Sequence, residues 1–305
     1  MSDAARTRPR ASTGPGESAS TTLRQLVRGI AGGLLLGLPP LFTMEMWFQG
    51  FLMDERKIIV LILFTFVIVI GYSAFSGFRR ERSWPDLVLD SVATMGVAAV
   101  VSAVALWLIG RIDPGIGLGD AVGKIGLQMI PISLGVSLAG AQLADPEDKG
   151  EEAADLGTSM TRSMHVGPWG RLSVVAGAAL FLSLNIAPTE ETIFLAVGAT
   201  WWGLVLIVIA SLLMSYAIVF YADFRGGRKP GTPGDSPLDH PLTETVVSYA
   251  LSLLVSGLLI WSFGRTEGTP YYPILAQIVL LGVVAAFGGA AGRLLIGGGA
   301  SGEAA

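Results

Sequence analysis

Long apolar stretches alternate with short polar links along most of this sequence. The stretches IIVLILFTFVIVIGYSAF (58–75) and LVLIVIASLLMSYAIVFY (204–221) contain no Asp, Glu, Lys, Arg or His. About 20 apolar residues in a row are enough for a helix to cross the hydrocarbon of a bilayer. A soluble protein could bury one such helix, but not a series of them. The pattern therefore predicts an all-α polytopic membrane protein in contact with the lipid bilayer.

The apolar pattern predicts eight transmembrane helices. They are expected near residues 27–51, 57–77, 86–109, 121–143, 171–198, 202–222, 243–263 and 272–296. With the N-terminus in the cytoplasm, fifteen of the Lys and Arg residues fall on the inner side and five on the outer side. This bias favours an even number of spans with both termini cytoplasmic. The alternative is seven spans, with one weak segment lying in the interface.

The two halves of the chain resemble each other, which indicates a duplication. An even number of spans per half gives both halves the same orientation, so we predict two parallel four-helix repeats related by a pseudo-two-fold axis along the membrane normal. The informative matches are Thr43/Thr189, Glu45/Glu191, Phe48/Phe194 and Phe78-Arg79/Phe224-Arg225 at an offset of 146, and Asp90/Glu244, Trp107/Trp261 and Gly110-Arg111/Gly264-Arg265 at an offset of 154.

The repeats divide the chain into five parts. Residues 1–25 are poor in apolar side chains and are predicted to be a disordered cytoplasmic tail. The first repeat covers 26–143 and the second 171–296, and 297–305 form a second disordered tail. The acidic segment 144–170 is expected to be a solvated cytoplasmic linker, with docking of a partner protein as the alternative.

Composition excludes several classes of function. Charged residues make up 14% of the chain, the mean hydropathy is +0.61 and there are no cysteines, so disulfides and thiolate chemistry are absent. The net charge of −4 is spread over the loops and does not indicate nucleic-acid binding. No nucleophile–base set, metal-ligand spacing or phosphate-binding loop is present, and we expect neither an enzyme nor a cofactor or bound metal.

Acidic residues follow two proline breaks within predicted spans. Glu45 follows Pro39-Pro40, and Glu190 and Glu191 follow Pro188. Carboxylates within a span are costly and are often functional, and transporters use broken helices to bind ions. Neutral oxygens suited to cations are expected from Thr43, Thr189 and Asn185. The six residues form a candidate cation or proton site, in which crowding would raise carboxyl pKa values.

A structural interpretation competes with this ion site. Proline at the first helical position, followed by acids in the first turn, is also an ordinary start of a helix. In that case the glutamates only cap helices at the outer surface and point into water. If Glu45 and Glu191 instead form a symmetric pair, Glu190 has no acidic counterpart and should be more exposed than Glu191.

Asp90 and its counterpart Glu244 lie near the inner ends of the third and seventh predicted spans. They are candidates for an inner gate or proton exit, with capping of helix N-termini as the alternative. Gln128 and Gln277 are expected to form hydrogen bonds between helices, and Gly288 and Gly292 have a small-xxx-small spacing. We predict that these glycines pack the two halves together, with homodimerisation as the alternative.

The stretches PPLFTMEMWFQGF and NIAPTEETIF, with the terminal GRLL region, resemble a bacterial family described only as putative integral membrane proteins, a domain of unknown function. The resemblance covers about residues 25–296. It implies an inner-membrane protein that is often encoded beside a second small protein, and it implies no activity.

Two functions are therefore carried forward. The first is a secondary transporter for a small cation, coupled to protons. The second is a non-transporting membrane subunit or scaffold for a partner protein.

Overall fold

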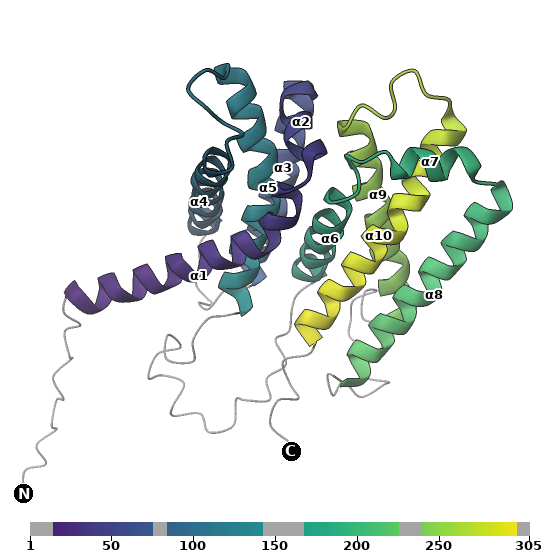
Figure 1. The fold of residues 1–305 in the computed structure, drawn as a ribbon. Helices are drawn as coiled ribbons and strands as arrows, with labels where there is room; N and C mark the ends of the chain where they lie inside the picture. The colour runs from purple at the N-terminus through teal and green to yellow at the C-terminus, as the bar shows by residue number, and fades with distance from the viewer. Residues whose placement is uncertain (1–14, 76–83, 143–167, 226–239, 298–305) are drawn as a thin grey trace, which may run out of the picture.

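The computed structural model describes residues 15–75, 84–142, 168–225 and 240–297, and the regular structure in these ranges is entirely helical (Figure 1). The first half contains α1 (Pro15–Leu41), α2 (Met44–Leu52), α3 (Glu55–Phe75), α4 (Trp84–Leu108) and α5 (Leu118–Gln142). The second half contains α6 (Pro168–Leu184), α7 (Glu191–Gly198), α8 (Trp201–Arg225), α9 (Pro241–Ser262) and α10 (Tyr271–Gly297). Helix α1 begins inside the predicted tail 1–25, while most of the acidic segment 144–170 lies outside the described residues.

Six of the described helices are long and apolar enough to cross a membrane: α3, α4, α5, α8, α9 and α10. The eight continuous spans predicted from the sequence are not found, because the first and fifth are broken. Helices α1 and α2 meet at an angle of 85° and count together as a seventh candidate span. Helix α6 has 17 residues and is about 26 Å long at 1.5 Å per residue, somewhat short of a bilayer core.

Both breaks lie beside prolines: Pro39 and Pro40 are in the last turn of α1, and Pro188 is in the link after α6. At the first break, the hydroxyl of Thr43 donates a hydrogen bond to the carbonyl of Pro40 over 2.8 Å. At the second, Thr189 donates in the same way to Ile186 over 2.7 Å. Proline removes a backbone donor and prevents the helix from continuing regularly. In each break the same carbonyl also accepts the backbone N–H of the threonine, over 3.2 Å at Pro40 and 3.0 Å at Ile186.

The order and packing of the helices correspond between the halves. Helix α5 packs against α1, α2, α3 and α4, and α10 packs against α6, α7, α8 and α9. Figure 1 shows α2, α7, the α4–α5 loop and the α9–α10 loop at the same end of the molecule. Gly110 and Gly264 follow α4 and α9 with φ values of 69° and 72°, a conformation that favours glycine and ends a helix.

Small residues bring helices together within each half, and Gly71 and Gly177 do the same where α3 meets α6. A Cβ on Gly135 of α5 would collide with the carbonyl of Gly32 in α1. A Cβ on Gly288 of α10 would lie 2.5 Å from the carbonyl of Ala178 in α6. The predicted role of Gly288 and Gly292 between the halves is therefore wrong, because both face α6. Close approach at small residues is a common way to pack helices in lipid.

The halves meet mainly where α3 packs against α6. The largest buried apolar cluster lies at this junction and includes Ile68 and Tyr72 from α3, Leu180 from α6 and Leu259 from α9. Helices α1 and α8 lie at opposite edges of the molecule (Figure 1). A closed two-fold arrangement would pair α1 with α8 wherever α3 pairs with α6, so the described helices do not have the predicted two-fold symmetry.

Candidate functional site

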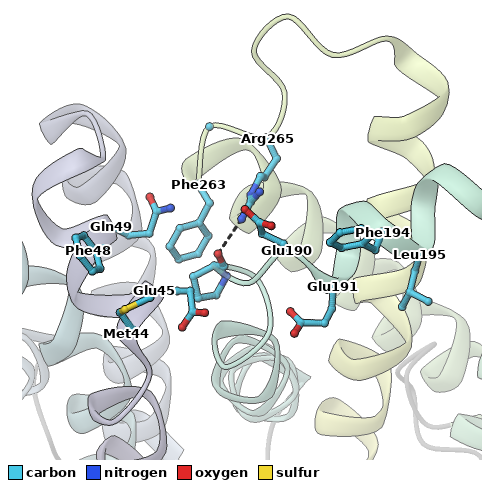
Figure 2. Close-up of a pocket in the computed structure, with 12 residues that line it drawn as sticks. Met44, Glu45, Phe48, Gln49, Glu190, Glu191, Phe194, Leu195, Phe263 and Arg265 are labelled. Atoms are coloured by element: carbon cyan, nitrogen blue, oxygen red, sulfur yellow. Dashed lines mark hydrogen bonds between the residues drawn. The ribbon is translucent and has the colours of Figure 1, made fainter.

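A pocket of about 910 Å³ opens between the halves at the end of the molecule that holds α2 and α7 (Figure 2). Helix α2 forms one wall, and the α6–α7 link with α7 forms the other. The end of α9 and the turn after it lie between them. The lining residues are Met44, Glu45, Phe48, Gln49, Pro188, Glu190, Glu191, Phe194, Leu195, Phe263, Gly264 and Arg265.

All three predicted glutamates line this pocket. Figure 2 shows the carboxylates of Glu45 and Glu191 directed into the space between α2 and α7. Glu45 is half-buried, whereas Glu190 and Glu191 are both exposed. The structure thus brings the three acids to one pocket. Glu190 was expected to be more exposed than Glu191, but both side chains are exposed.

The glutamates also occupy helix starts, as the capping interpretation requires. Glu45 and Glu191 lie in the first turns of α2 and α7, and Glu190 holds the N-cap position of α7. Neither cap residue, Thr43 or Glu190, forms a side-chain capping hydrogen bond. The acids are thus placed favourably for the helix dipoles.

The electrostatics of Glu191 differ from the sequence-based expectation. The neighbouring Thr189 hydroxyl, followed by a hydrogen bond from its own backbone N–H, lowers the pKa of Glu191 below its usual value. Hydrogen bonds to a carboxylate favour the charged form. Crowding was expected to raise carboxyl pKa values in this site, but the pKa of Glu191 is lowered.

The predicted neutral ligands do not face the pocket. The hydroxyls of Thr43 and Thr189 hydrogen-bond to carbonyls in their own breaks, and the amide of Asn185 donates to the carbonyl of Phe181 over 2.8 Å. None of the three lines the pocket. Short polar side chains bond readily to the nearby backbone, and here that local bonding uses the groups that the sequence analysis assigned to an ion.

Arg265 is a pocket residue that the sequence analysis did not assign to the site. Its Nη2 atom donates to the carbonyls of Pro188 and Thr189, over 2.8 and 3.2 Å. Gly264 allows the sharp turn that brings this guanidinium back to the α6–α7 link. The repeated Gly-Arg pair, Gly110-Arg111 and Gly264-Arg265, could have drawn attention to this arginine, but in the sequence it only supported the duplication.

The three carboxylates do not form a metal centre. Within the described ranges, no group of three or more His, Cys, Asp or Glu side chains is arranged to hold a metal ion. The walls also carry three phenylalanines, at positions 48, 194 and 263, together with Met44 and Leu195. The pocket therefore combines separated negative charges with aromatic and aliphatic surface.

The predicted inner acids have different environments. Asp90 on α4 is half-buried. Glu244 is buried in the first turn of α9 and forms an ion pair with Arg293 of α10, with 2.6 Å between Oε1 and Nε. The Arg293 partner was not anticipated, because the first half has no arginine at the matching position near Ala139 and Gly140. Glu244 therefore joins two helices of the second half.

Comparisons with known proteins agree with the membrane architecture. No curated protein and no solved structure matches the chain. The model of one family, described as putative integral membrane proteins (DUF2391), matches residues 25–296. This range includes all ten described helices except the first ten residues of α1 and the last residue of α10. The chain is an integral membrane protein and belongs to the DUF2391 family.

Proposed function

We propose that this protein binds a small organic cation in the pocket between α2 and α7 and transports it across the membrane. The observation that carries the proposal is the grouping of Glu45, Glu190 and Glu191, from both halves of the chain, around one cavity. Three carboxylates and the Arg265 guanidinium give the lining a formal charge of −2. Opposite charge within a poorly screened cavity attracts a cation from solution.

The walls favour an organic cation over a dehydrated metal ion. A metal such as Ca²⁺ requires several oxygen ligands at close range, and the described carboxylates are not arranged in this way. The faces of Phe48, Phe194 and Phe263 suit an ammonium group with an apolar body, since aromatic rings attract cations by about 0.5–2 kcal/mol. The volume is also in the usual range for small-molecule sites.

The architecture supports transport through a duplicated fold. We propose that α1–α5 and α6–α10 are copies of one five-helix unit, in which the first helix of each copy is broken at proline. Counting each broken pair as one crossing gives eight crossings and cytoplasmic termini, in agreement with the Lys and Arg bias. Broken helices beside a ligand site are a recurrent feature of secondary transporters.

Uptake by proteoliposomes tests the proposal. The full-length protein should accumulate radiolabelled tetraethylammonium in exchange for protons that leave an acidic vesicle lumen, and Rb⁺ should enter much more slowly. The Glu45→Gln/Glu191→Gln variant should lose at least tenfold of the uptake, because two of the three charges are removed. The matched control is Glu55→Gln, which changes an exposed acid in the first turn of α3 outside the pocket.

Two results would contradict the proposal. Equal uptake by the wild type and the double variant would remove the pocket from the transport route, and Rb⁺ uptake faster than tetraethylammonium uptake would indicate an inorganic cation. The scaffold alternative rests on segment 144–170, most of which lies outside the described residues. It stays a prediction, as does a small membrane partner protein.

A further inference from the structure

The two walls of the pocket carry the same pair of side chains. On α2, Glu45 is followed by Phe48, one helical turn further along. On α7, Glu191 is followed by Phe194 at the same spacing, and the two pairs are counterparts at the offset of 146. Residues three apart lie on one face of a helix, and all four side chains line the pocket. Each wall therefore presents a carboxylate together with an aromatic ring.

Each of these pairs suits one ammonium group. A carboxylate attracts its charge, and the face of an aromatic ring attracts it as well. Phe48 is 41% exposed and Phe194 is 75% exposed, so a ligand can reach both rings. Figure 2 shows the carboxylates of Glu45 and Glu191 directed into the space between α2 and α7. The pocket thus contains two similar cation half-sites, one on each half of the chain.

The remaining lining adds apolar surface and no further net charge. Phe263, at the end of α9 between the two walls, is 6% exposed. The formal charges of Glu190 and Arg265 cancel, so Glu45 and Glu191 account for the charge of −2 on the lining. A ligand with one positive charge would leave one of the two half-sites uncompensated.

We infer that the preferred substrate is a diammonium compound, with one cationic group at each end of an aliphatic chain. One ammonium group binds at Glu45 on α2 and the other at Glu191 on α7, while the methylene groups cross the apolar surface at Phe263. The second contact forms within the complex, so two linked contacts bind more tightly than either alone. The inference rests on the proposed cation pocket and names the class of substrate within it.

Calorimetric titration of the full-length protein in nanodiscs tests this substrate class. The ligands are the diamines from 1,4-diaminobutane to 1,8-diaminooctane, each compared with the alkylamine of the same chain length. The best diamine should bind at least about fivefold more tightly than its alkylamine, which is the factor that one exposed ion pair can contribute. A purely apolar pocket would give the reverse order, because the alkylamine has the larger apolar surface.

Single variants at the two half-sites separate bridging from simple charge attraction. Glu45→Gln and Glu191→Gln should each reduce diamine binding to the level of the matched alkylamine. Alkylamine binding should fall only slightly, because the other half-site still accepts one ammonium group. Glu55→Gln, outside the pocket in the first turn of α3, should keep the full diamine preference. Thermal melts of the variants should match the wild type, because none of the three acids is buried.

The outcomes distinguish this inference from the proposed transport. Equal binding of diamines and alkylamines to the wild type would overturn the diammonium class, even where tetraethylammonium uptake still depends on Glu45 and Glu191. A diamine preference that persists in either single variant would also overturn it, because the second ammonium group would then bind elsewhere. Tetraethylammonium uptake that is unchanged in the double variant contradicts the transport proposal, and the inference falls with it.

A second measurement reports on the two walls directly. The chain has no cysteine, so Leu52→Cys on α2 and Val197→Cys on α7 provide two sites for spin labels. These residues are 66% and 78% exposed and lie outside the pocket lining. A diamine that bridges the walls should narrow the distribution of distances between the labels in pulsed EPR, whereas the matched alkylamine should leave it unchanged. Identical distributions with both ligands at saturation would overturn the bridging geometry.

Discussion

The buried ion pair between Glu244 and Arg293 offers a quantitative test of the packing of α9 on α10. Both side chains are less than 10% exposed, and the charged atoms are 2.6 Å apart. At an effective dielectric constant of about 20, this separation corresponds to an attraction of about 6 kcal/mol. Dehydrating each ion costs several kcal/mol, so the intact pair contributes little net stability, while either charge alone is strongly unfavourable.

We therefore expect a large coupling between the two positions. Glu244→Leu and Arg293→Met should each reduce the free energy of unfolding by about 3–5 kcal/mol, because each removes the ion-pair partner of a buried charge. The double variant should recover at least half of the summed loss, since it buries two apolar side chains instead. SDS titration of the purified protein in mixed micelles, followed by tryptophan fluorescence, measures the four stabilities of this cycle.

An exposed pair provides the matched control. Lys57 of α3 forms an ion pair with Glu267 of the α9–α10 loop, and the Glu267 side chain is 73% exposed. Glu267→Gln should cost no more than about 1 kcal/mol, as surface ion pairs usually do. If the double variant at positions 244 and 293 loses the full sum of the single losses, the two buried charges do not stabilise each other and the reasoning is refuted.

Three further predictions follow from the contacts between helices and from the second break. Gly135→Val should destabilise the protein by about 1–3 kcal/mol through overpacking against α1. Gly96→Ala, which meets no neighbour within 4 Å, should be neutral or stabilising. Thermal melts that rank the two variants in reverse would contradict the packing. Gln128→Leu should cost about 0.6–2 kcal/mol by removing the hydrogen bond to the carbonyl of Gly37, and Gln277→Leu should cost less, because its Oε1 has no partner; equal losses in SDS titration would contradict this difference. Thr189→Val should raise the pKa of Glu191. As the pH is lowered, the variant should therefore lose tetraethylammonium binding at a higher pH than the wild type does. Superimposable binding profiles would show that this hydroxyl has no such effect.

The sequence predicted the helical membrane architecture and singled out the three glutamates that line the pocket, because both depend on strong local signals. Apolar runs of span length leave few alternatives to helices, and the match of Glu45 with Glu191 places both acids at the same level of the fold. The proline breaks were also visible. The right-angle bend between α1 and α2, which removes a continuous first span, depends on how α2 packs on α5 and has no signal in hydropathy.

Other features depend on contacts that the sequence does not reveal. The direction of the Arg265 side chain follows from the turn at Gly264 and from the position of the α6–α7 link. The orientation of Gly288 toward α6 instead of the other half is decided by which face of α10 meets a neighbour. Thr189 was assigned as a ligand oxygen because the sequence does not show what its hydroxyl bonds to. The hydrogen bond to a carbonyl three residues earlier forms only when the break is folded.

The arginines that follow α4 and α9 each attach a turn to a wall of the pocket in their own half. Arg265 ties the α9–α10 turn to the α6–α7 link through two carbonyls. In the first half, the guanidinium of Arg111 lies 4.2 Å from the ring centre of Trp47, and thereby fastens the α4–α5 turn to α2. Each wall of the pocket is thus held by contacts within its own half. Widening of the pocket mouth would therefore move one half away from the other. The exposed Lys57–Glu267 ion pair joins the halves near the mouth and would oppose this motion only weakly.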